Sequence, residues 1–165
     1  VRIERAEQRD VNDVDVDGSL KGVLAKELLS NWQAETYKAQ AVVARTYAIY
    51  EARTDSPTRH WDVTDDQRSQ VYGGIAAETD RSRRAVDATV GTFVACGPPG
   101  DEKIFKAYFS ACCGGVGENP TDAFGEPFHP ALVERNVGTL CSASPSAPST
   151  VFNSTTSTAS RRLRQ

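Results

Sequence analysis

The chain has 165 residues, a net charge of −3 and an apolar fraction of 39%. This length fits one domain with a sizeable core, and the composition is ordinary for a soluble globular protein. The net negative charge argues against nucleic acid as the main partner, because phosphate contacts need a clustered basic surface. No stretch of the sequence is apolar for long enough to span a bilayer. There is no methionine and no visible secretory signal, so we expect a processed protein or an excised fragment.

The first half of the sequence predicts strands followed by two helices. Short alternating apolar runs in residues 1–16 indicate one or two strands. Residues 17–29 are predicted to be helical, because three leucines recur at four-residue spacing. A longer, alanine-rich helix should follow, with Ser30 and Gln33 spaced as a capping box and an end near Arg53. Residues 55–74 are polar and turn-rich, and a loop of this length is typical of a functional or mobile segment.

The second half predicts one more helix and a hairpin. Residues 80–89 read as a helix stopped by Gly91. Residues 92–96 and 104–111 read as strands joined by a turn of glycines and prolines. We therefore expect an α+β fold, with the alanine-rich helix packed on a mostly antiparallel sheet. We expect one domain over residues 1–141, followed by a Ser/Thr/Ala/Pro-rich arm over residues 142–165 that is a truncated element.

An acidic run near the start is a candidate calcium site. Asp13, Asp15, Asp17 and Gly18 match the first half of an EF-hand loop. The twelfth position of that loop should be a bidentate glutamate, but here it is Leu24. The alternative is a strand end followed by a helix N-terminus, where acidic side chains are favourable.

The cysteines Cys96, Cys112, Cys113 and Cys141 are compatible with disulfides and an oxidising compartment. Zinc is the alternative, but no pair has the C-x2-C spacing, so we expect no metal and no cofactor. If a hairpin closes at residues 97–103, Cys96 lies near its turn and Cys112 far from it. A bridge between these two is then awkward, because bridged Cα atoms must lie within about 7 Å. We therefore prefer the pair Cys113–Cys141, which would staple the irregular C-terminal stretch.

Three further residues are candidates for chemistry or binding. Glu27 lies near the end of an apolar helix, where a half-buried carboxyl group is a usable general acid. The alternative is a solvent-facing glutamate. Arg45 is a single cation in an apolar run and needs a partner, which is either a structural carboxylate or a substrate. Ser110 is a candidate nucleophile, but no His/Asp partnership is visible and G-x-S-x-G is absent.

The long run from Leu20 to Ala48 resembles the stage II sporulation protein D (SpoIID/LytB) family. The family pattern there is roughly Y-L-x-G-V-V-x-x-E-M-P-x-x-W-x-x-E-x-L-K-A-Q-A-V-x-A-R-T-Y-A, and the similarity is ungapped. Residues 70–74, with the sequence QVYGG, and residues 108–115 agree with two further family blocks in the same order. The resemblance covers residues 14–141. There are departures: Leu29 replaces a usual proline, and Ser110 stands where many members have histidine.

The resemblance implies a lytic transglycosylase that cleaves the β-1,4 bond between N-acetylmuramic acid and N-acetylglucosamine, leaving 1,6-anhydro ends. It implies long loops that form a glycan cleft. It also implies that Glu27 is the essential catalytic residue, which acts first as the acid and then as the base. It assigns substrate-binding or supporting roles to a further set of residues: Arg45, Gln70, Tyr72, Tyr108 and Ser110.

The same resemblance implies partners and a location. Peptidoglycan glycan strands are the expected partner, together with other cell-wall hydrolases, and the expected location is extracytoplasmic. Residues 62–69 lack the histidine and cysteine that bind zinc in some members. The alternative is a non-catalytic peptidoglycan-binding module that enhances an amidase, because LytB-like members are described as amidase enhancers.

Overall fold

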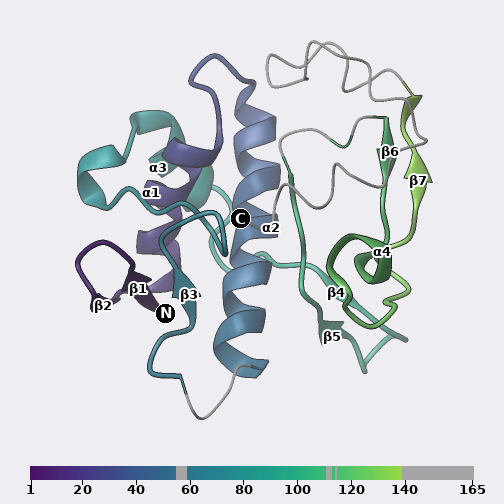
Figure 1. Ribbon diagram of the computed structural model, residues 1–165. Coiled ribbons are helices and arrows are strands. Elements are labelled where there is room, and N and C mark those ends of the chain that lie inside the picture. The colour runs from purple at the N-terminus through teal and green to yellow at the C-terminus, as the bar shows by residue number, and fades with distance from the viewer. Residues whose placement is uncertain (55–58, 111–112, 114, 139–165) are drawn as a thin grey trace. The chain divides into compact units, whose positions relative to one another are not determined.

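The computed structural model describes residues 1–54, 59–110, 113 and 115–138. The chain divides into two compact units, Val1–Phe109 and Ser110–Gln165 (Figure 1). Among the described residues, the first unit contains a three-stranded sheet, a short hairpin and three α-helices, and the second contains a two-stranded sheet and one short helix. This combination of helices and small sheets confirms the predicted α+β class.

The three-stranded sheet consists of β1 (Arg2–Arg5), β2 (Asp10–Asp13) and β3 (Val63–Thr64), in the order β2-β1-β3. β1 pairs antiparallel with β2 and parallel with β3. The sequence does not predict β3, because two residues are too short for an alternating pattern. This strand anchors the loop that the sequence predicts over residues 55–74 to the N-terminal strand.

Helix α1 (Val16–Glu27) begins at Asp15, whose Oδ1 accepts a hydrogen bond from the Gly18 N–H at 2.8 Å. This is an N-cap, which satisfies a backbone donor that the first helical turn leaves unpaired. Asp15 therefore does what the helix-start interpretation of the acidic run predicts. Leu20 and Leu24, which lie on the predicted apolar face of this helix, are fully buried.

Helix α2 (Ala34–Thr54) packs against α1 and α3, as Figure 1 shows, and also contacts β3. Its small residues Ala41, Ala44 and Ala48 are buried and allow this close packing. The end of the helix agrees with the prediction, but the predicted capping box at Ser30 is wrong. Residues 28–33 form a turn, in which the Trp32 N–H donates to the Leu29 carbonyl at 3.0 Å.

Helix α3 (Asp80–Asp87) follows the one-turn 3-10 helix η1 (Ile75–Ala77). The side chains of Thr79 and Ser82 form a reciprocal capping box that the sequence analysis did not identify. After the helix, Gly91 has a φ of 72°, which fits the predicted stop. Strands β4 (Ala95–Cys96) and β5 (Lys103–Ile104) confirm the predicted hairpin, although each strand is shorter than predicted.

The described part of the second unit contains β6 (Val116–Gly117), α4 (Pro120–Phe124) and β7 (Arg135–Asn136). β6 and β7 pair antiparallel. Cys112, Cys141 and the predicted arm lie outside the described residues. The proposed pairing of Cys113 with Cys141 and the domain end at residue 141 therefore stay predictions.

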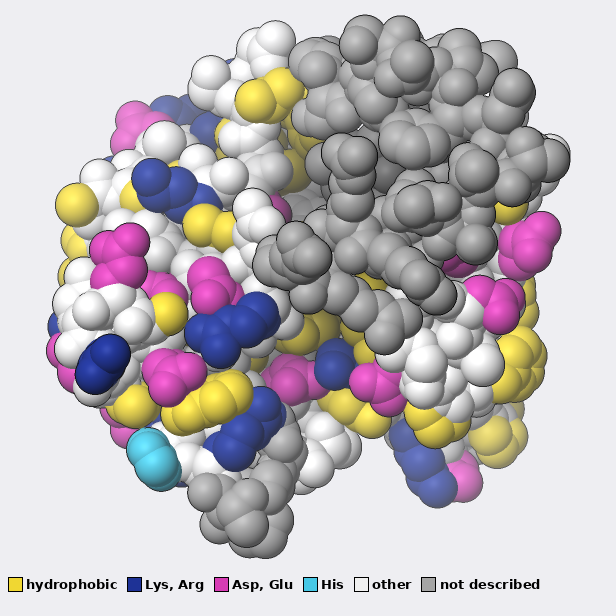
Figure 2. All heavy atoms as spheres, viewed as in Figure 1, with side chains coloured by type: hydrophobic (Ala, Val, Ile, Leu, Met, Phe, Trp, Pro, Cys, Tyr) yellow, Lys and Arg dark blue, Asp and Glu magenta, His cyan; other side chains and the backbone are white. Residues whose placement is uncertain are grey.

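The surface of the first unit carries both signs of charge. Figure 2 shows acidic and basic side chains interspersed over the described part of the face that it draws. Among the described residues, the helices are too short or too polar to cross a bilayer.

Candidate functional site

Glu27 is the last residue of α1, and its side chain is half-buried. The Val71 N–H donates a hydrogen bond to Glu27 Oε1 at 2.8 Å, across 44 positions of sequence. Oε2 receives no hydrogen bond within the described ranges. One oxygen of the carboxyl group is therefore fixed by the backbone of a distant segment, and the other remains available for proton transfer.

The segment of residues 70–74, which contains Val71, is itself tied down on two sides. Gln70 is 3% exposed, and its Nε2 donates to the Ala44 carbonyl of α2 at 2.9 Å. The Tyr72 N–H donates to the Asp65 carbonyl at 3.2 Å. These two bonds orient the Val71 N–H toward Glu27, so that the carboxyl group depends on α2 as well as on α1.

Two glycines let this segment approach α1 closely. A Cβ on Gly22 would lie 2.8 Å from the Gly74 carbonyl oxygen and 3.0 Å from Tyr72 Cε2. A Cβ on Gly73 would lie only 2.6 Å from Lys26 Cε. Neither glycine was predicted to have a role, although both stand in segments that resemble the family pattern. Which segments approach each other closely is decided by the fold. The only sign of such an approach in the sequence is a glycine inside a predicted helix.

Tyr72 and Tyr108, both predicted to bind substrate, pack against one apolar cluster. The cluster consists of the buried side chains Ile3, Tyr47 and Val63. The rings of Tyr47 and Tyr108 meet edge to face, with centroids 6.4 Å apart. The structure thus brings Tyr72 and Tyr108 to the same part of the first unit, next to β1 and β3. Their contact with substrate stays a prediction.

A buried ion pair that the sequence analysis missed supports this cluster. Glu51 of α2 is 8% exposed, and its Oε1 lies 2.9 Å from Lys106 Nζ. Burial lowers the pKa of Lys106, but the hydrogen bond to Glu51 and nearby negative charges outweigh burial, so the net pKa is raised. Lys106 Nζ also lies 5.4 Å from the Tyr108 ring centroid. The pair therefore holds the segment after β5 against α2.

Arg45 is 2% exposed, and its partner is Asp17 at the start of α1. Its Nε and Nη2 lie 2.8 and 2.7 Å from Asp17 Oδ1, and its Nη1 donates to the Thr92 carbonyl at 2.9 Å. Asp17 and Glu27 are ten residues apart on one helix, about 15 Å along its axis. Arg45 is therefore tied to the end of α1 opposite Glu27, and its predicted role in substrate binding stays a prediction.

The acidic run at the start of α1 is thus occupied with protein contacts. Asp15 caps the helix, and Asp17 pairs with Arg45. Within the described ranges, no three His, Cys, Asp or Glu side chains are grouped as a metal site requires. Ser110 is exposed and begins the second unit, whereas the other residues predicted to act in catalysis or substrate binding lie in the first.

Comparison with known proteins identifies the family. The model of the SpoIID family, described as stage II sporulation protein, matches residues 4–95. The chain belongs to this family. The matched region includes Glu27, Arg45, Gln70 and Tyr72, and it ends before Tyr108.

Two relatives illustrate how far the similarity extends. An uncharacterised protein of Brachyspira hyodysenteriae is 35% identical over 122 residues, which cover 70% of this chain and 30% of the relative. A protein of Bacillus subtilis strain 168 named amidase enhancer is 39% identical over 72 residues, 44% of this chain and 9% of the relative. The chain therefore spans less than a third of the length of each of these two proteins.

Proposed function

We propose that this chain is a lytic transglycosylase domain that cleaves peptidoglycan glycan strands, with Glu27 as its single acid and base. The observation that carries the proposal is the geometry of Glu27. Its carboxyl group is half-buried at a helix end, one oxygen accepts the Val71 N–H at 2.8 Å, and the other has no bond among the described residues. Membership of the SpoIID family supports a role at the cell wall.

The proposed reaction needs one carboxyl group and no water. Protonated Glu27 donates its proton to the glycosidic oxygen, the bond from that oxygen to C1 of N-acetylmuramic acid breaks, and an oxocarbenium-like centre develops at C1. The Glu27 carboxylate then takes the proton of the C6 hydroxyl on the same sugar, and O6 bonds to C1. The products are a free 4-hydroxyl on N-acetylglucosamine and a 1,6-anhydro end.

The contacts of Glu27 suit a residue that both gives and takes a proton. A hydrogen bond to one oxygen limits rotation of the carboxyl group and directs the other oxygen to a fixed point, which lowers the entropy cost of reaching the transition state. We place substrate contacts at Tyr72, Tyr108 and Ser110, with Gln70 and Arg45 supporting the cleft. The site of action is extracytoplasmic, because the proposed substrate is found there.

Product analysis tests this proposal. Purified peptidoglycan, with and without its stem peptides, is incubated with the chain, and the soluble products are analysed by mass spectrometry. We expect fragments with 1,6-anhydro ends, which are lighter by one water than the products of a hydrolase. Fragments with ordinary reducing ends would contradict the single-carboxyl mechanism.

A second candidate function is a peptidoglycan-binding module that enhances an amidase. The name of the Bacillus subtilis relative, amidase enhancer, favours it. The test is to measure the release of stem peptides by a purified cell-wall amidase in the presence and absence of the chain. Faster release together with an absence of 1,6-anhydro products would favour the module over the enzyme.

A further inference from the structure

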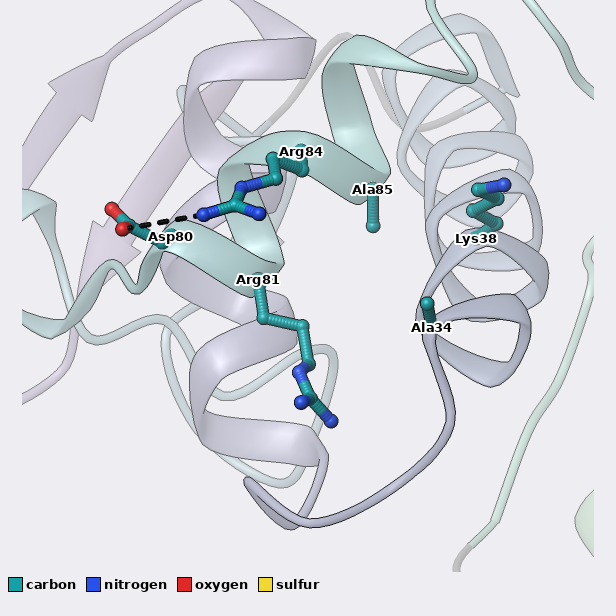
Figure 3. A pocket seen from close by; sticks show the side chains of 6 residues that line it. All are labelled: Ala34, Lys38, Asp80, Arg81, Arg84 and Ala85. Atoms are coloured by element: carbon teal, nitrogen blue, oxygen red, sulfur yellow. Dashed lines mark ion pairs between the residues drawn. The ribbon is translucent and has the colours of Figure 1, made fainter.

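A pocket that does not include Glu27 lies between the first turn of α2 and helix α3. Its volume is about 360 Å³, which is within the range of small-ligand sites. Figure 3 shows the side chain of Arg81 extending from α3 toward the turn that joins α1 to α2. Six residues line the pocket: Ala34, Lys38, Asp80, Arg81, Arg84 and Ala85. Three of them, Lys38, Arg81 and Arg84, are cationic.

Arg81 differs from the other cations of the pocket in its charge balance. Lys38 Nζ lies 2.7 Å from Glu35 Oε1, and Arg84 Nη2 lies 3.6 Å from Asp80 Oδ2. Within the described part of the chain, Arg81 has no carboxylate within 4 Å. The guanidinium of Arg81 therefore contacts only neutral groups among the described residues.

Those neutral groups hold the guanidinium in place. Arg81 Nη1 donates to the Trp32 carbonyl, and its Cζ lies 5.7 Å from the ring centroid of Tyr37, which is buried. The carbonyl and the aromatic face hold a cation without neutralising it. An oriented guanidinium that keeps its charge is suited to an anion with two oxygens, either a carboxylate or a phosphate.

We infer that this pocket binds an anionic group of the cell-wall polymer through Arg81. The inference rests on the proposed function, because that function brings the chain to a polymer rich in such groups. Wall polymers present carboxylates on lactyl groups and peptide stems, and phosphates on polyol-phosphate chains. Trp32, the contact of Arg81, is five residues after Glu27, so an anion held here is anchored beside the turn that follows the proposed catalytic residue.

Co-sedimentation with insoluble peptidoglycan tests the inference. The variants are Arg81→Gln and its charge-retaining counterpart Arg81→Lys. The matched control is Arg83→Gln, which makes the same change on the same helix at a residue that does not line the pocket. We expect Arg81→Gln to weaken binding about five- to tenfold, Arg81→Lys to weaken it less, and Arg83→Gln to stay within about twofold of the unmodified chain.

Two preparations of peptidoglycan distinguish the sources of the anion, one carrying polyol-phosphate chains and one stripped of them. A loss of binding on both preparations indicates a carboxylate, and a loss only on the first indicates phosphate. Equal binding by Arg81→Gln and the unmodified chain on both preparations would overturn the inference, as would an equal loss in Arg83→Gln.

A second pair of variants keeps the test valid if Arg81→Gln fails to fold. Ala34 is exposed at the first position of α2, where a glutamate favours the helix. Ala34→Glu should neutralise Arg81 and weaken binding, whereas Ala34→Gln should not. A cleavage assay on the unmodified chain separates this inference from the proposed function: binding that depends on Arg81 without any cleavage would contradict only the proposed enzyme.

Discussion

The Val71 N–H donates a hydrogen bond to Glu27 Oε1 at 2.8 Å, joining the end of α1 to a segment 44 residues later. This contact makes the position of the proposed catalytic carboxyl group depend on a loop. The loop depends in turn on β3, which pairs with β1, and on Gln70, which bonds to α2. A change far from Glu27 in sequence should therefore alter its chemistry.

Replacement of Gly22 by alanine should separate these two segments. The added Cβ would lie 2.8 Å from the Gly74 carbonyl oxygen, so the segment of residues 70–74 must shift away from α1. We expect a fall in cleavage rate of about tenfold or more, because small displacements of catalytic groups are costly. The measurement is the initial rate of product release. Gly117→Ala is the control, since its Cβ would meet nothing closer than 3.7 Å, and a similar rate loss in both variants would contradict the account.

Arg45 and Asp17 should contribute to stability as a pair. Removal of either partner leaves the other charge unpaired in a largely buried place, so we expect Arg45→Gln to lower the free energy of unfolding by about 3 kcal/mol. Asp17→Asn should lower it by at least as much, because it leaves the charge of Arg45, the more buried partner, without a counter-ion. Urea denaturation of both variants and of the double variant measures this. If Arg45→Gln unfolds like the unmodified chain but binds glycan poorly, then Arg45 acts on substrate instead.

Asp62 should make the first unit sensitive to acid. Burial raises the pKa of Asp62, but hydrogen bonds from the Arg2 side chain and backbone outweigh it, so the net pKa is below its usual 3.8. A carboxyl group with a lowered pKa contributes stability that is complete above the unfolded value and is lost as pH falls through the folded value. Denaturation midpoints of the unmodified chain and Asp62→Asn should therefore converge as pH falls below about 3.8. A constant difference from pH 7 to pH 2 would be inconsistent with this role.

The sequence predicts the helices better than the loops, for a physical reason. Leu20 and Leu24 repeat with the helical period, so the helix around them is visible in the sequence. Asp62 and Gln70 are different, because each is fixed by a partner far along the chain, Arg2 and Ala44. No local pattern encodes such contacts. The candidate residue Glu27 was found by resemblance of its surroundings to a family, whereas its contact with Val71 required the fold.

Cysteine pairing is a separate prediction that mass spectrometry settles. We expect Cys113 and Cys141 to be joined in the oxidised chain. Alkylation without reductant should then leave both residues unmodified, and alkylation after reduction should modify both. Peptide mapping that recovers Cys113 or Cys141 bridged to another cysteine would contradict the preferred pairing.

The central claim is that one carboxyl group, that of Glu27, performs the cleavage. The most direct measurement compares the rate of 1,6-anhydro product formation for the unmodified chain and Glu27→Gln, which keeps the size of the side chain and an oxygen to accept the Val71 N–H. The account predicts a fall of about 100-fold or more, with an unchanged thermal midpoint and unchanged binding to peptidoglycan. Equal rates of product formation by the two proteins would contradict it.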